Sequence, residues 1–328
     1  MVRLIDVKRF LILAALISTT PTVQLPHHHT LRFIVTGDAG STHSRLRAGM
    51  RAVMKTMPID AILLVGDNFY PCGVNGVDDP QWTKITQHFG PAHLPIYAVL
   101  GNHDYGDQQE RGGPDYATCG HPDPQAEVAE TGKIAEWHMP ARNYVLHAPM
   151  ADFAMIDTQP IALNFPKDYD GSLGAAEEKS WIGEELAQMH AHWHIVVGHH
   201  TIFSSGMHGR TNDATQARVR ELLPLFRENH VDLYICGHDH DMELLGDLQR
   251  GSDPLFLVSG AGSGTDEIRP RHASVMAKEP PTIYPRFPAK ATVGFAILEI
   301  DAAHLTVTFF DDAGKKIGGP FTKTKGEG

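Results

Sequence analysis

Five runs of apolar, largely β-branched residues each end at a glycine-containing turn whose side chains carry metal-binding or catalytic donor atoms. Ligands of α/β sheets bind beyond the carboxyl ends of the strands, so turns of this kind converge when their strands pack side by side. Glycine lets the backbone turn sharply at such a strand end. We therefore expect one crevice built from turns that lie far apart in the sequence. The runs and their turns are 31–35 with TGDAG, 61–65 with GDNFY, 96–100 with GNHD, 194–197 with GHH and 233–236 with GHDH.

The donors in these turns are too many for one metal ion. A single turn such as GHDH is more often ordinary turn chemistry, but a buried cluster of so many ionisable groups is costly unless a cation compensates it. Oxygen and nitrogen donors without a thiolate suit iron, zinc or manganese. The sequence thus predicts two ions bridged by Asp67, about 3.5–4 Å apart, as in sites for in-line phosphoryl displacement. The predicted ligands are Asp38, Asp67, Tyr70, Asn102, His199, His238 and His240.

The remaining periodicity indicates the α/β class. Further strands are expected at 144–146, 153–156, 255–258, 295–300 and 305–310, and helices at 44–57, 177–190 and 214–229, the last with Asp213 as its cap. Many late strands follow one another without helices, which favours a mixed sheet, or two packed sheets with helices outside. Residues 105–136 and 265–290 are expected to be long surface loops, the first with room for a short helix. No linker is visible, so we expect one catalytic domain over residues 30–324.

Composition excludes several classes of protein. The formal net charge of −11 argues against a nucleic-acid groove, although bound cations can still attract an anionic substrate. Three cysteines are too few for a disulfide framework. Cys72 and Cys119 lie in loop-like sequence and could pair in an exported protein, whereas Cys236 lies in an apolar strand and is expected in the core.

The N-terminus has the layout of a secretory signal. Arg3, Lys8 and Arg9 precede the apolar run 10–17, which is followed by small polar residues. The run is too short to span a bilayer, so no stable membrane insertion is expected. We predict a signal peptide over residues 1–24 and export to the periplasm or the extracellular space. An N-terminal strand or an amphipathic helix is the alternative.

The ordered set GDAG, GDNFY, GNHD, VVGHH and GHDH resembles the binuclear metallophosphoesterases, and in particular the small purple acid phosphatases of the tartrate-resistant type. The likeness continues through MIDTQ (155–159), MHG (207–209), LVSGAGSG (257–264) and GFAILEIDAAHLTVTFFDDAGK (294–315). It implies a calcineurin-like αββα sandwich of two mixed sheets flanked by helices. It also implies an acid phosphatase in which a hydroxide made available by the metal pair attacks the phosphorus of a monoester.

The resemblance assigns roles to single residues. It places Fe(III) at Asp38, Tyr70, His240 and Asp67, and a divalent iron, zinc or manganese at Asn102, His199, His238 and Asp67. Tyr70 distinguishes this subfamily, since a phenol with an ordinary pKa near 10 needs a strong Lewis acid to remain a phenolate in acid. His103 and His208 resemble the outer-sphere histidines that orient phosphate and protonate the leaving oxygen, with Asp104 expected to orient His103.

Three features depart from the family pattern and leave substrate choice open. His200 stands where the family usually has tyrosine, and we expect it to be a passive neighbour. The pair Pro71–Cys72 and the segment 105–136 also differ from the animal enzymes. Small phosphorylated substrates and a monomer are expected. The alternatives are a divalent-metal phosphodiesterase or nucleotide phosphatase of the same superfamily, and an exported metal-binding protein without activity.

Overall fold

Two mixed β-sheets pack face to face in the computed structural model, which describes residues 20–41, 45–106, 120–210, 214–248, 253–266, 268 and 285–325. The first sheet, in spatial order, contains β15 (Lys316–Thr324), β14 (His304–Asp311), β13 (Gly294–Ile300), β2 (Leu31–Thr36), β3 (Ala61–Val65), β4 (Ile96–Val99) and β5 (Trp137–His138). The second contains β1 (Thr22–Gln24), β6 (Tyr144–His147), β7 (Ala151–Met155), β8 (Trp193–Val197), β9 (Leu233–Cys236), β11 (Leu255–Ser259), β10 (Met242–Leu245) and β12 (Pro285–Lys290).

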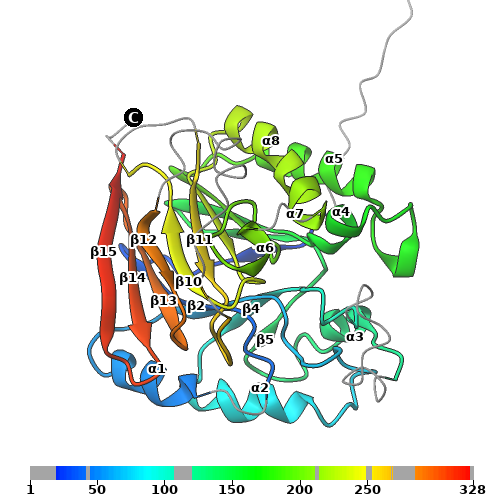
Figure 1. Cartoon of the computed structure of the whole chain (residues 1–328), viewed down its shortest axis with the longest axis horizontal. Coiled ribbons are helices and arrows are strands. Elements are labelled where there is room, and N and C mark those ends of the chain that lie inside the picture. The colour runs from blue at the N-terminus through cyan, green and yellow to red at the C-terminus, as the bar shows by residue number, and fades with distance from the viewer. Residues whose placement is uncertain are drawn as a thin grey trace, which may run out of the picture.

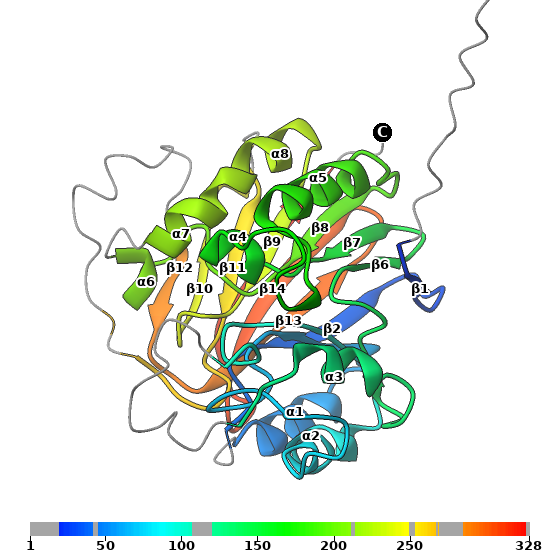
Figure 2. The ribbon, with the colours of Figure 1, turned by 90° about the vertical axis from the view of Figure 1, so that its right-hand side faces the viewer.

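Helices cover the outer faces of both sheets. Figure 2 shows α4, α5, α7 and α8 along one side of the strands and α1 and α2 along the other, so the layers follow the order expected for an αββα sandwich. The helices are α1 (Leu46–Met54), α2 (Trp82–His88), α3 (Pro124–Ala129), α4 (Gln159–Leu163), α5 (Ala175–Leu186), α6 (Met207–Arg210), α7 (Ala214–Val219) and α8 (Leu223–Glu228), with short 3₁₀ turns η1 (Gly90–Ala92), η3 (Tyr169–Gly171) and η4 (Arg220–Leu222).

The central strands are parallel and apolar on both faces. β2, β3 and β4 run parallel in one sheet, and β7, β8, β9 and β11 run parallel in the other. All residues of β3, β4 and β9 are buried, and so are the last three residues of β8. This is expected for strands covered on both faces. Phe33 and Phe153 meet edge to face across the inter-sheet core, with ring centroids 5.3 Å apart. This arrangement brings the carboxyl ends of β2, β3, β4, β8 and β9 to one region of the sandwich.

Each helical layer buries one apolar stripe. In α1 the buried residues Leu46, Met50 and Val53 recur with helical spacing and join the core of the first sheet. On the other side Phe226 of α8 packs against Tyr234 of β9 in a second core, with ring centroids 5.5 Å apart. Burial of these stripes, more than local propensity, holds short helices in place.

Several predicted element boundaries are wrong. The helix expected over 214–229 is divided by η4, because Pro224 in the first turn of α8 has no backbone N–H to continue the preceding helix. The end of the expected loop 265–290 is strand β12, where Phe287 stacks on Phe309 with centroids 4.4 Å apart. β12 lies at the edge of its sheet, where proline is tolerated. Asp213 and residues 107–119 lie outside the described residues.

The described part of the chain begins at residue 20, and the first nineteen residues of the expected signal lie outside it. Thr22–Gln24 form β1, which pairs in parallel with β6 (Figure 2). In the other sheet, β15 lies at the edge beside β14 (Figure 1). The Thr20 hydroxyl donates a hydrogen bond of 2.6 Å to Glu185 of α5 and accepts one of 3.1 Å from the Trp181 indole. Among the described residues, no helix has the length and apolar character needed to cross a bilayer.

Candidate metal centre

Three donor residues in the strand-end turns have left-handed backbone conformations. Asp38, Asp67 and His238 have φ values of 56°, 53° and 70°, in the left-handed region that polar residues such as aspartate tolerate better than most. The turns also approach very closely at Gly101, where a Cβ atom would lie 2.2 Å from Asp67 Oδ1. Glycine at position 101 is therefore required by the packing of the donor cluster.

Four of the predicted ligands form one group around the Tyr70 hydroxyl. Tyr70 Oη lies 3.1 Å from Asp38 Oδ1, 2.9 Å from Asp67 Oδ2 and 3.0 Å from His240 Nε2. His240 Nε2 is in turn 3.4 Å from Asp38 Oδ1. Two carboxylates, a phenol and an imidazole thus point at a common position.

The other three predicted ligands form a second group beside the first. Asn102 Oδ1 lies 3.0 Å from His199 Nε2 and 3.0 Å from His238 Nδ1. His199 Nδ1 faces the carbonyl oxygen of Val65 at 2.9 Å, which fixes the ring so that Nε2 faces the amide. The turns after β4, β8 and β9 therefore supply an oxygen and two nitrogen atoms to one position.

Asp67 belongs to both groups. Its Oδ2 accepts the Tyr70 hydroxyl, whereas its Oδ1 lies 3.4 Å from His199 Nε2 and accepts the backbone N–H of His103 at 2.9 Å. Burial would raise the pKa of this carboxyl, but His199, His103 and the two hydrogen bonds outweigh burial and lower it to about 2. Asp67 is consequently an anion placed between the two donor groups.

Burial and neighbouring charges shift the pKa values of the other titratable donors. Burial raises the pKa of Asp38, and burial with the nearby Asp38 and Asp67 charges raises the pKa of Tyr70 well above its ordinary value. For His240, burial is outweighed by Asp38, Asp266 and Asp67, and its pKa rises to about 9. Burial and the neighbouring histidines lower the pKa of His238. A phenol held between two carboxyl groups loses its proton only when a bound cation offsets their negative field.

The two predicted catalytic histidines border the cluster. His103 Nδ1 lies 2.6 Å from the carbonyl oxygen of Pro71, and its Nε2 lies 3.9 Å from Asp67 Oδ2, so Nε2 faces the donors. The His208 ring stacks on His238 with centroids 3.9 Å apart, and its backbone N–H donates to Asp239. His103 therefore stands beside the Tyr70 group and His208 beside the Asn102 group.

The prediction that Asp104 orients His103 is wrong. The Asp104 carboxylate is fully buried and accepts backbone N–H groups of Gly101, Asn68 and Phe69 at 2.8–3.2 Å. It therefore holds together the two turns that carry Asp67 and Asn102, and the Pro71 carbonyl takes the expected place beside the His103 ring. The sequence offers no signal for that contact, because a backbone carbonyl is present at every position.

Glu127 on α3 is a buried acid that the sequence analysis missed. Its Oε2 accepts a 2.9 Å hydrogen bond from the Asn68 amide, which also donates to the Val99 carbonyl. Burial and the nearby Asp104 raise the pKa of Glu127 well above its ordinary 4.5, and burial with Asp67 raises that of Asp104 to about 7. A helix inside the expected loop 105–136 thus braces the turn that carries Asp67.

We expect Glu127→Gln to stabilise the metal-free protein at pH 8 but not at pH 4. The folded Glu127 keeps its proton above pH 4.5 while the unfolded chain releases it, so native stability falls as pH rises toward the raised pKa. The amide resembles the protonated acid and does not titrate. The gain should grow by at most about 1.4 kcal/mol per pH unit in urea unfolding. The exposed Glu228→Gln should show no such gain, and equal pH slopes for native and Glu127→Gln protein would contradict the assignment.

His200 lies behind the cluster. Its Nδ1 is 2.8 Å from the Thr158 hydroxyl, whose oxygen accepts the backbone N–H groups of His199 and His200 at 3.3 and 3.2 Å. The hydroxyl proton is therefore directed at His200 Nδ1. The ring of His200 packs 4.6 Å from that of His238. Cys72, two residues after Tyr70, is disulfide-bonded. Cys236, two residues before His238, is a buried free thiol, and Cys119 lies outside the described residues.

The donor set fits a pair of metal ions. Lone-pair atoms of Asp38, Asp67 and His199 all lie within 4.8 Å of one another, although each of these side chains is buried. Two buried carboxylates this close repel each other unless a cation compensates their charge. The two donor groups and the shared Asp67 match two ions with one bridging carboxylate.

Comparison with known proteins identifies the family of the chain. The model of the family described as calcineurin-like phosphoesterase matches residues 31–242. Purple acid phosphatase 7 of Arabidopsis thaliana is 34% identical over 254 residues, which is 71% of this chain and 70% of the relative. The human tartrate-resistant acid phosphatase type 5 is 29% identical over 317 residues, 88% of this chain and 89% of the relative.

Solved structures show the same fold. The structure of GAP50, described as the anchor in the inner membrane complex of Plasmodium, has a TM-score of 0.65 and 22% identity, and covers 90% of this chain and 88% of its own. The purple acid phosphatase PPD1 from yellow lupin seeds has a TM-score of 0.59 and 19% identity, and covers 89% of this chain and 54% of its own. With the matched family model and relatives, the chain belongs to the calcineurin-like phosphoesterase family, and within it to the purple acid phosphatases.

Proposed function

We propose that this phosphatase hydrolyses phosphate monoesters in acid with a binuclear centre of Fe(III) and a divalent ion. Fe(III) would be held by Asp38, Tyr70, His240 and the shared Asp67, and divalent iron, zinc or manganese by Asn102, His199, His238 and Asp67. The observation that supports this assignment best is the Tyr70 hydroxyl, which lies within 3.1 Å of three other donors. A phenol in a donor set is suited to a trivalent ion, which favours its ionised form more strongly than a divalent ion does.

When bound, the two ions supply Lewis acidity toward phosphate and lower the pKa of water. Side chains of the protein would donate the proton and orient the phosphate. His103 Nε2 faces the donors, while the Pro71 carbonyl holds Nδ1, so the ring can deliver a proton at a defined atom to the leaving oxygen. His208, stacked on His238, stands where a second imidazole can orient the phosphate.

Export is part of the same proposal. A disulfide at Cys72 is typical of proteins that leave the cytosol, and the basic and apolar N-terminus has the composition of a secretory signal. We propose a secreted or periplasmic enzyme that acts as a monomer on small phosphorylated compounds. Secretion with loss of the N-terminal segment, measured by mass spectrometry of the exported protein, is the expected result.

Tyr70→Phe is expected to abolish the visible absorption of the purified protein. An iron–phenolate pair gives a broad visible band, and phenylalanine keeps the ring but removes the only phenol oxygen placed among the described donors. The measurement is an absorption spectrum with metal analysis of native and variant protein. Tyr97→Phe removes a buried phenol of the same sheet outside the donor cluster and should keep the band.

Colour also separates the competing functions. A colourless, iron-free protein with full activity toward phenyl phosphate would contradict the Fe(III) site and favour the divalent-metal phosphodiesterase or nucleotide phosphatase. A coloured protein without any turnover of phenyl phosphate or of phosphodiesters would instead favour a metal-binding protein that retains the fold.

A further inference from the structure

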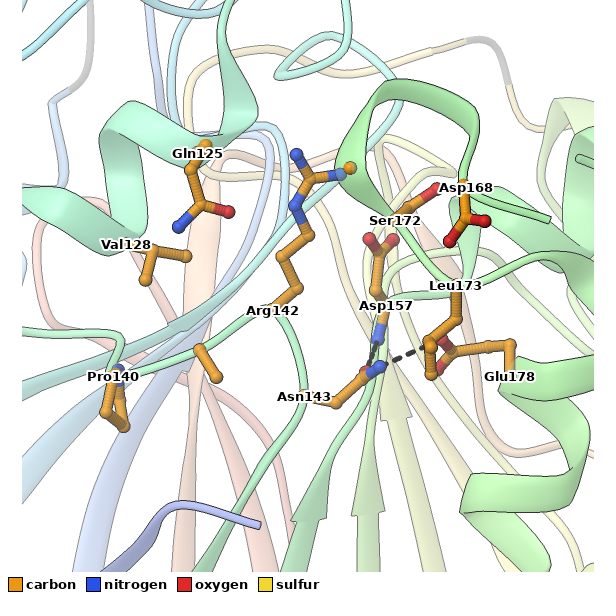
Figure 3. Close-up of a pocket in the computed structure, with 12 residues that line it drawn as sticks. Gln125, Val128, Pro140, Arg142, Asn143, Asp157, Asp168, Ser172, Leu173 and Glu178 are labelled. Atoms are coloured by element: carbon orange, nitrogen blue, oxygen red, sulfur yellow. Dashed lines mark hydrogen bonds between the residues drawn. The ribbon is translucent and has the colours of Figure 1, made fainter. Parts of the chain in front are cut away.

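A pocket with a volume of about 340 Å³ opens between α3 and the segment that joins α4 to α5. Figure 3 shows Arg142 between Gln125 of α3 on one side and Asp168 and Ser172 on the other, with Asn143 below them. Val128, Pro140 and Leu173 add apolar surface. A volume of this order suits a small organic molecule.

The buried wall of the pocket consists of hydrogen-bonding groups that are tied to one another. Asn143 accepts the backbone N–H of Asp157 at 2.6 Å and donates at 2.8 Å to Glu178 Oε2 (Figure 3). Asp157 also accepts the Tyr105 hydroxyl, which in turn accepts Arg142 at 2.8 Å. Glu178 belongs to the pocket lining and is 1% exposed, and its buried Oε1 has no hydrogen-bond partner. A buried polar atom of this kind is an anchor for a ligand that can hydrogen-bond.

The pocket lies next to the metal centre. β7 and β8 run parallel with Met155 opposite Val197, and Asp157 and His199 each lie two residues beyond that pair. Thr158, the neighbour of Asp157, accepts the backbone N–H of His199. On the other side Tyr105 stands two residues after His103 in the sequence. Residues that line or brace the pocket are thus joined to the turns of both Asn102 and His199.

We propose that this pocket binds the polyhydroxylated organic part of the substrate, so that the enzyme prefers sugar or polyol phosphates to monoesters without hydroxyl groups. The inference rests on the proposed phosphatase function and specifies its substrate class. A hydroxyl group both donates and accepts, so it can satisfy Glu178 Oε1 and the Ser172 hydroxyl oxygen while carbon atoms of the ring contact Leu173 and Val128.

The charges of the lining make a second phosphate group or an amine less suitable as the ligand of this pocket. A second phosphate would find Arg142 as the one basic side chain of the lining, already engaged with Tyr105 and flanked by Asp157, Asp168 and Glu178. An amine would need ionised carboxylates, whereas burial raises the pKa of Glu178 well above its ordinary value and raises that of Asp157. The buried wall therefore offers hydrogen bonds without a surplus of charge.

The test is the selectivity ratio, kcat/KM for glucose 6-phosphate divided by kcat/KM for phenyl phosphate, in the metal-loaded enzyme. Leu173→Trp places an indole in the pocket from an exposed position (39% exposed) and should lower the ratio by about tenfold or more. Glu178→Met keeps the length of the side chain without its oxygens and should lower the ratio similarly. Glu178→Gln, which keeps hydrogen-bonding atoms, should stay within about threefold of native.

Unchanged ratios in Leu173→Trp and Glu178→Met, or equal losses for both substrates, would overturn the pocket assignment. If Glu178→Met does not fold, Leu173→Trp decides, since its change lies at the surface. If the native enzyme turns over neither substrate, the proposed function fails instead. Thermal unfolding then tests whether the pocket binds the ligand. Glucose 6-phosphate should then raise the unfolding midpoint of native protein but not of Leu173→Trp, and equal midpoint shifts would overturn it.

Discussion

Asp67→Asn should lower kcat/KM for phenyl phosphate by about 10³-fold or more and reduce the metal content from two ions to one or none. The Asp67 carboxylate contacts both donor groups, through Oδ2 at Tyr70 and Oδ1 at His199. Its loss removes one anionic ligand from each ion. Metal clamps contribute several kcal/mol to phosphoryl transfer, and about 4 kcal/mol corresponds to a 10³-fold change in rate.

Asparagine is the replacement that isolates the charge. Asp67 has a φ of 53°, and asparagine tolerates the left-handed region as well as aspartate does. An amide can still receive the His103 N–H through its oxygen, so the turn should keep its shape. The matched control is Asp168→Asn, the same change at another aspartate with positive φ (60°), which should bind two ions. Two ions and native activity in Asp67→Asn would refute the bridge.

The donor residues could be predicted because their signal is local. Each strand that ends in glycine and a metal ligand can be recognised in a few residues, and parallel strands place such ends at one edge. Asp38 and His240 lie far apart in the sequence, yet the structure places Asp38 Oδ1 3.4 Å from His240 Nε2. The same reasoning predicted α1, α5 and most strands, since their apolar periodicity is regular.

The supporting residues could not be predicted, because they act through tertiary contacts. Glu127 lies in a segment without periodicity and gains its role only where α3 meets Asn68. Asp104 has an imidazole beside it in the sequence, but its carboxylate accepts the backbone N–H groups of Gly101 and Phe69. β12 contains two prolines and becomes a strand because Phe287 fills a place in the core beside Phe309. Tertiary packing decided each of these cases.

The fold by itself does not decide the activity. A structure described as an anchor shares this fold over 90% of the chain. In the present chain the predicted metal ligands and the predicted proton donors lie together. The sharpest test of activity therefore changes a residue that contacts the donor cluster but is not a metal ligand.

His103→Ala is that test, and it should lower kcat for phenyl phosphate by about 10²–10⁴-fold while both ions remain bound. The His103 ring packs against Tyr70 with centroids 4.3 Å apart, and its Nδ1 is held by Pro71. Alanine keeps the backbone N–H that donates to Asp67, so the bridging carboxylate keeps that partner. The acidic limb of the pH–rate profile should be retained, and the limb that reports a protonated imidazole should disappear.

The control is His93→Ala, which removes an imidazole that is 84% exposed and should leave metal content and kcat unchanged. Leaving-group dependence then separates proton donation from mere support of the site. If His103 donates the proton, the loss in kcat should be large for alkyl phosphates, whose leaving oxygen needs protonation, and small for nitrophenyl phosphate, whose leaving group is already stable as an anion. Equal losses for both esters would show that His103 positions phosphate and does not protonate the leaving group. Loss of iron from His103→Ala would instead make the histidine a support of the Tyr70 ligand.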